Sequence, residues 1–151
     1  VDAGMSEGLS GLMLSLGAGC GIAVRLLFGF RLDGSRTKPF RWAGGLSLVG
    51  AAGVVLLASG APTAHVLATV VAFGCGWVWP VFTNFGIVRA NAAAAASATG
   101  LTQMGVYIGV FTAPLVTGRL IEASGYATMW LVVAATMAVG AMLAFVVADD
   151  F

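Results

Sequence analysis

Long apolar stretches with almost no charge constrain this chain more than any other feature of its sequence. Five of them are close to the length of about 20 residues that a helix needs to cross a bilayer. None shows the alternation of polar and apolar residues that marks the strands of a membrane barrel. The sequence therefore predicts an all-α, polytopic membrane protein with about five transmembrane helices, at residues 8–30, 42–59, 63–87, 97–121 and 126–148.

The composition supports this class. Of the 151 residues, 60% are hydrophobic and 9% are charged, and the mean hydropathy is +1.01; a soluble domain of this length could not bury so much apolar surface. The net charge of +1, without a basic stripe, gives no indication of a nucleic-acid partner. Cys20 and Cys75 lie inside apolar runs, so we expect buried thiols and neither a disulfide nor a metal site. We expect no cofactor, and because the chain begins at Val1 we expect it to be part of a longer protein.

The densest run of charge lies between the first two apolar stretches, from Gly29 to Arg41. It holds four of the seven cations, and Arg89 lies in the connection between the third and fourth stretches. The opposite side of a five-helix arrangement holds Arg119 alone. Because cytoplasmic loops carry the excess of lysine and arginine, we expect the Gly29–Arg41 loop and the C-terminus to be cytoplasmic, in a multi-pass protein of the cell (inner or plasma) membrane.

A motif follows from the same region. The sequence GAGCGIAVRLLFGFRLDGSRTK, followed by a new apolar stretch, resembles the cytoplasmic loop signature of the major facilitator superfamily of transporters. Gly29, Asp33 and Lys38 match that signature, and the positions that depart from it are Gly34, Arg36 and Thr37. The stretch ATGLTQMGVYIGVFTAPLVTGRLIEASGY also resembles the eleventh span of the superfamily. The resemblance covers nearly the whole chain and matches its stretches with the last five of twelve spans.

The resemblance implies a partial major facilitator fold and alternating access, in which two helical halves rock around a central site. The partners that it implies are a small-molecule solute, the lipid bilayer and the missing N-terminal spans of the same transporter. It also implies that Gly29, Asp33, Arg36 and Lys38 belong to a cytoplasmic gate loop, with Asp33 as its latch. The same charges could serve only to set the topology, so both interpretations stay open.

Polar residues in the third and fourth stretches gather on single helix faces, which lipid does not favour. At about 100° per residue, Trp77 and Asn84 share a face of the third stretch, with Trp79 on the opposite side. Gln103 and Tyr107 share a face of the fourth. Trp77, Asn84, Gln103 and Tyr107 are therefore candidates to line a solute cavity, and ordinary packing between helices is the alternative.

Three further features predict how the helices pack. Gly105 and Gly109 form a GxxxG pair, which favours close contact between helices. The second and fifth stretches carry almost no strongly polar group, so we expect them at the periphery, facing lipid. Arg25 lies within the first stretch on a face of small residues, where a charge in hydrocarbon costs about 3 kcal/mol. We expect it to point into protein and pair with an anionic solute or an acid; the alternative is an arginine whose head reaches the interface.

These features favour part of a secondary active or facilitative transporter that moves a small solute. The alternative is a small multi-pass scaffold or assembly subunit without transport activity. An enzyme is not expected, because the sequence has no Ser/His/Asp set and no cluster of metal ligands. No aspartate or glutamate lies in the middle of a stretch, so a proton-coupling group would lie in other spans, or the transporter is an exchanger or a facilitator.

Overall fold

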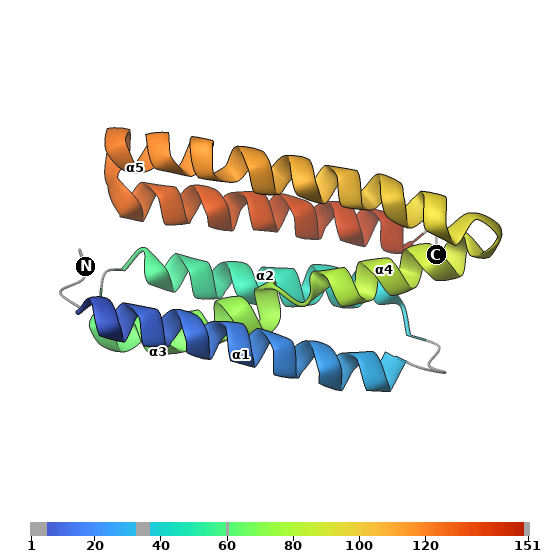
Figure 1. Ribbon diagram of the computed structural model, residues 1–151, viewed down its shortest axis with the longest axis horizontal. Helices are drawn as coiled ribbons and strands as arrows, with labels where there is room; N and C mark the ends of the chain where they lie inside the picture. The colour runs from blue at the N-terminus through green and yellow to red at the C-terminus, as the bar shows by residue number, and fades with distance from the viewer. Residues whose placement is uncertain (1–5, 33–36, 60, 150–151) are drawn as a thin grey trace.

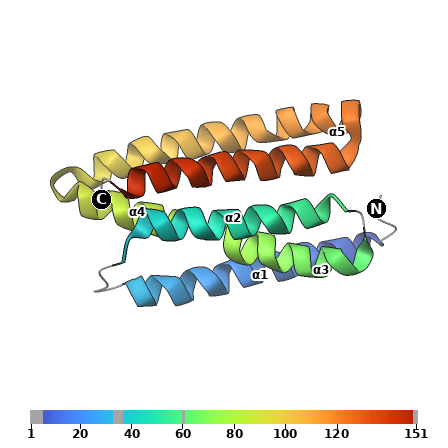
Figure 2. The same cartoon turned by 180° about the vertical axis from the view of Figure 1, so that it is seen from behind.

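The computed structural model describes residues 6–32, 37–59 and 61–149, and these residues form helices with short connections and no strand (Figures 1 and 2). This confirms the predicted all-α class. In chain order the elements are α1 (Glu7–Leu32), α2 (Pro39–Leu57), α3 (Pro62–Val71), the π-helical turn η1 (Ala72–Gly76), α4 (Trp79–Ala90), the short 3₁₀ turn η2 (Ala92–Ala94) and α5 (Ala95–Ala148).

Four helical stretches in the described residues are long and apolar enough to cross a membrane: Glu7–Leu32, Pro39–Leu57, Ala64–Ala90 and Ala92–Ala148. They are compatible with membrane insertion. Most of their large apolar side chains that are exposed would otherwise face water at a high cost. The bundle therefore has the surface expected of a protein in lipid.

Helix α5 consists of two helices that meet at Gly125, and the chain folds back on itself there (Figure 1). Gly125 has φ 79° and ψ 173°, a conformation that only glycine adopts without strain. We call residues 95–124 the first arm of α5 and residues 126–148 its second arm. The predicted number of about five transmembrane helices therefore depends on counting the two arms separately.

Helix α2 lies at the centre of the bundle, between α5 on one side and α3, η1 and α4 on the other (Figures 1 and 2). A Cβ added at Gly50 would collide with the backbone of Gly76, and one at Gly44 would lie 3.0 Å from the carbonyl oxygen of Ala141. The prediction that this stretch lies at the periphery is wrong. Small apolar residues let neighbours approach α2 from two sides, so its lack of polar groups reflects close packing and not exposure to lipid.

The two arms of α5 differ in burial. The buried residues of this helix all belong to the second arm, and they are Met129, Ala134, Ala141 and Ala148. No residue of the first arm is buried, and Leu101 and Phe111 there are 74% and 75% exposed. The fifth apolar stretch therefore packs more closely than predicted, and the fourth is the more exposed of the two.

Aromatic contacts join α1, α2 and α4. The ring of Phe82, on α4, is almost fully buried and lies 5.2 Å from the ring centroid of Phe28 on α1. It also stacks on Trp42 of α2, with ring centroids 6.2 Å apart and an angle of 11° between the planes. These contacts fix α4 against its neighbours and so place the segment that precedes it.

Candidate functional site

The third apolar stretch is broken close to its middle. Helix α3 continues into the π turn η1, and Trp77 then leaves helical geometry, with φ −94° and ψ 4°, before α4 begins at Trp79. Pro80 explains the break, because it has no N–H to donate to the carbonyl of Gly76 and its ring would clash with that carbonyl in a continuous helix. Turns of the π type occur often at functional sites, so the break is the first candidate for one.

Glycines of two helices make room for the wide π turn. On α2, a Cβ at Gly53 would lie 2.8 Å from the backbone nitrogen of Ala72. On α1, a Cβ at Gly21 would lie 3.3 Å from the carbonyl oxygen of Phe73. The backbone of η1 therefore rests directly on α1 and α2, which hold it in place.

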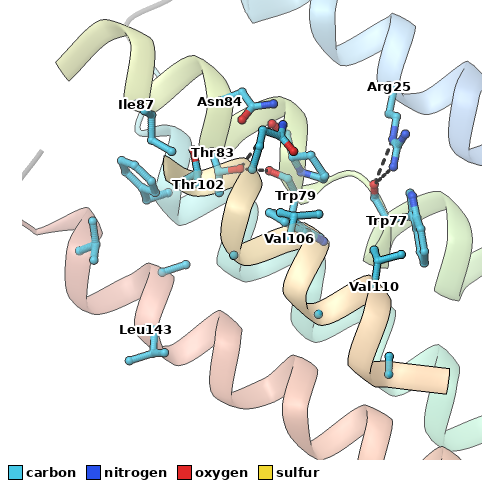
Figure 3. A pocket seen from close by; sticks show the side chains of 18 residues that line it. Arg25, Trp77, Trp79, Thr83, Asn84, Ile87, Thr102, Val106, Val110 and Leu143 are labelled. Atoms are coloured by element: carbon cyan, nitrogen blue, oxygen red, sulfur yellow. Dashed lines mark hydrogen bonds between the residues drawn. The ribbon is translucent and has the colours of Figure 1, made fainter. Parts of the chain in front are cut away.

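Arg25 reaches the break from α1. Its Nε and Nη2 donate hydrogen bonds of 3.0 and 2.7 Å to the carbonyl oxygen of Trp77 (Figure 3). In a continuous α-helix that oxygen would accept from the N–H of Val81, which here bonds to the carbonyl of Val78 at 3.0 Å. Arg25 thus points into protein, as expected, but its partner is a backbone carbonyl and not an acid. The guanidinium does not reach for the end of the helix.

A cavity of about 910 Å³ lies beside the break, which is within the usual range for sites that bind small molecules. Its walls come from α4, both arms of α5 and Phe40 of α2, with Arg25 and Trp77 at one end (Figure 3). Most of the lining is apolar, and a few polar groups face it. This is the composition typical of a site that binds a solute without reacting with it.

The structure brings four of the five predicted cavity residues to this lining: Arg25, Trp77, Asn84 and Gln103. Tyr107 is not among the lining residues and is 68% exposed. The first arm of α5 faces the cavity with Thr102, Val106 and Val110, among others. Because Tyr107 follows Val106 by one residue, it points about 100° away from the centre of that face.

Other lining residues were not predicted. Trp79 was expected on the side opposite Trp77, but the break rotates α4 relative to η1, so both tryptophans line the cavity. A helical wheel drawn through an unbroken stretch could not show this; Pro80 was its only signal. Gly105 and Gly109 were expected in close packing, yet a Cβ at either would meet nothing within 4 Å, and both line the cavity.

The polar groups of the lining differ in how they are satisfied. The hydroxyl of Thr83 donates to the carbonyl of Trp79, and that of Thr102 donates to the carbonyl of Ala98, each at 3.0 Å. The carboxamides of Asn84 and Gln103 form no hydrogen bond with another residue in the described part of the chain. These two amides are therefore available to bind water or a solute, as donors and as acceptors.

The predicted gate loop is described only at its edges. Asp33 and Arg36 lie outside the described residues. Gly29 is exposed on α1, and Lys38 is exposed and precedes the first residue of α2 without a side-chain cap. The latch role of this loop stays a prediction.

Charges at one end of the bundle fit the predicted grouping of the loops. The end of α1, the start of α2, the end of α4 and the C-terminus lie at the same end (Figure 1). Arg41, at the start of α2, forms an ion pair with Asp149 at 3.8 Å, with both side chains well exposed. The compartment that this end faces stays a prediction.

Metal binding has little support in the described residues, where no group of three His, Cys, Asp or Glu side chains could hold an ion. The lining offers hydrogen bonds, one positive charge and aromatic surface. What this set can do chemically is bind and orient a small molecule.

No protein-family model, no curated protein and no solved structure matches this chain. The resemblance to the major facilitator superfamily therefore rests on the motifs of this sequence alone.

Proposed function

We propose that this chain forms part of a secondary active or facilitative membrane transporter, of the major facilitator type, that moves a small solute by alternating access. The observation that carries the proposal is the cavity beside a broken helix in an otherwise apolar bundle. Backbone that leaves helical geometry at membrane depth is tolerated where it is buried in protein or lines a water-filled cavity. Discontinuous helices of this kind form the solute sites of many transporters.

In this proposal the chain crosses the membrane five times, with the arms of α5 as separate spans. The Gly29–Arg41 loop and the C-terminus then face the cytoplasm of a cell membrane, because their end of the bundle carries Lys38, Arg41 and Arg89. The Gly29–Arg41 loop would act as the cytoplasmic gate. The topology follows from the charges and is independent of the solute.

The chain would supply one wall of the solute path. The first arm of α5 has no buried residue, although it borders the cavity with Gln103. The opposing wall would come from the N-terminal spans of the same transporter. We therefore expect solute transport only when both walls are present.

Labelling of introduced cysteines tests whether the cavity holds water. In a background without natural thiols (Cys20→Ala, Cys75→Ala), Gln103→Cys should react with a charged, membrane-impermeant thiol reagent on the order of 10-fold faster than Leu131→Cys. The reason is that the reactive thiolate forms in water and not in hydrocarbon. Leu131 is the matched control, because it is half-exposed on the second arm of α5 and lies outside the lining. Equally slow labelling would contradict a water-filled cavity and favour the scaffold alternative.

Protection from the same reagent then identifies solutes without a transport assay. A solute that occupies the cavity should slow the labelling of Gln103→Cys and Asn84→Cys. It should leave Arg41→Cys unchanged, because Arg41 lies at the end of the bundle and outside the lining. If no solute from a broad panel protects the two cavity positions, although they are accessible to water, a transport role loses its main support.

A further inference from the structure

We propose that Arg25 is a positioning residue: its guanidinium caps the carbonyl that the helix break leaves free and thereby keeps the indole of Trp77 on the cavity wall. The hydrogen bonds belong to the fold, and the inference rests on the proposed function only in treating the cavity as a solute site. The argument has three steps: the unpaired carbonyl, the choice of arginine, and the position of the indole.

The break creates an unpaired acceptor in an apolar environment. Pro80 has no N–H, and the N–H of Val81 bonds to Val78, so the carbonyl of Trp77 has no partner within its own helix. A backbone carbonyl without a hydrogen bond is costly where water is scarce. Arg25 supplies two donors to this one oxygen, at 3.0 and 2.7 Å.

Arginine suits this task better than lysine. Its planar guanidinium presents several N–H groups in a fixed fork, whereas the ammonium of lysine is a compact and strongly hydrated charge. Hydrogen bonds from a charged donor are stronger than those between neutral groups. The two bonds also explain how the half-buried cation of Arg25 is tolerated within an apolar stretch.

The same helix holds Trp77 from a second side. The indole of Trp77 is 58% exposed at the cavity and stacks on Phe73, with ring centroids 5.9 Å apart and planes at 14°. The ring of Phe73 packs where a Cβ on Gly17 of α1 would come within 3.0 Å of it. Helix α1 thus positions the ring beneath the indole through a glycine and the carbonyl of Trp77 through Arg25. Loss of the cap frees the backbone at Trp77 to rotate and carries the indole off the wall.

The test compares three variants in the complete protein in lipid nanodiscs. Arg25→Met keeps the length of the side chain and removes the donors, Arg25→Lys keeps the charge and one donor, and Arg41→Met is the matched control at an exposed ion pair. Hydrogen–deuterium exchange is measured for the amides of residues 77–81. We expect Arg25→Met to exchange about 10-fold faster there, which is the loss expected for hydrogen bonds from a charged group. Arg25→Lys should be intermediate, and Arg41→Met should match the natural protein.

A spectroscopic readout separates positioning from a general loss of stability. The protein has four tryptophans, and incorporated 5-fluorotryptophan gives each its own ¹⁹F resonance, with that of Trp77 assigned by Trp77→Phe. Arg25→Met should shift the Trp77 resonance and leave that of Trp130 in place. Arg25→Lys should restore it in part.

Three results would overturn the proposal: natural exchange at residues 77–81 in Arg25→Met, equal acceleration across the whole bundle, or an unmoved Trp77 resonance. If Arg25→Met does not fold, Arg25→Lys decides by the same two readouts. Failure here leaves the labelling of Gln103→Cys unaffected, so it is distinguishable from failure of the proposed transport function.

Discussion

Two pairs of glycines in this protein have similar spacing and opposite surroundings. Gly50 and Gly53 of α2 meet the backbone of η1 so closely that a methyl group at either would collide with it. Gly105 and Gly109 of α5 have nothing within 4 Å of an added Cβ, and they line the cavity. Glycine spacing therefore shows where a helix can be approached closely, and it does not show whether a neighbour makes that approach.

The contrast divides the molecule into a packed side and an open side. On the packed side, α2 holds a π turn that would otherwise be too wide to fit. On the open side, the first arm of α5 stands away from α4, and the space between them is the cavity. The same residue type thus supports the helix break in one place and widens the proposed solute site in the other.

The largest effect is expected at Gly50. Gly50→Val forces α2 away from the backbone of Gly76, which has no flexible side chain to yield, and should lower the free energy of unfolding by about 3 kcal/mol. Unfolding in mixed detergent micelles measures it. Gly45→Val is the matched control on the same helix, because a Cβ at Gly45 meets nothing within 4 Å. Equal losses in the two variants would remove the packed side of the comparison.

An intermediate effect is expected at Gly86, where the neighbour is a side chain. A Cβ there would lie 2.8 Å from Cε2 of Phe40, and the end of a ring yields more easily than backbone. Gly86→Ala should therefore lower the free energy of unfolding by about 1 kcal/mol. Phe40 also lines the cavity, so its shift should change the labelling rate of Gln103→Cys. A loss as large as that of Gly50→Val would mean that Phe40 cannot move.

The smallest effect, of opposite sign, is expected at Gly109. Gly109→Ala meets no neighbour and replaces glycine within a helix, which should raise the free energy of unfolding by about 0.5 to 1 kcal/mol. Thermal unfolding followed by circular dichroism measures the shift. A loss of stability instead would show that another helix packs on this face, and the open side of the comparison would fail.

Much of the fold follows from hydropathy alone. The helical class and the positions of the apolar stretches could be predicted because length and continuity are properties of the chain itself. The reversal of α5 at Gly125 falls within a predicted connection, since glycine there permits the positive φ. The central place of α2 could not be predicted, because small apolar residues are compatible both with lipid and with close packing.

The site was predictable where a residue's own chemistry decides its place. Asn84 and Gln103 are poorly tolerated in lipid, and both line the cavity. Tyr107 and Trp79 were misplaced because a helical wheel assumes a single straight helix and a known centre for its inner face. The partner of Arg25 left no trace of its own in the sequence, since every residue has a backbone carbonyl, and only Pro80 indicated that one would be free.

The π turn also has a consequence for how this chain tolerates insertion and deletion. A turn of this type holds about one residue more than an α-helical turn, so it sets the angular phase of everything that follows. Removing a single residue from 72–76 would restore a regular turn and rotate α4 by about 100°. Asn84 would then face away from the cavity, although hydropathy, length and topology would hardly change. The solute path would be lost through a shift of phase that no hydropathy profile records.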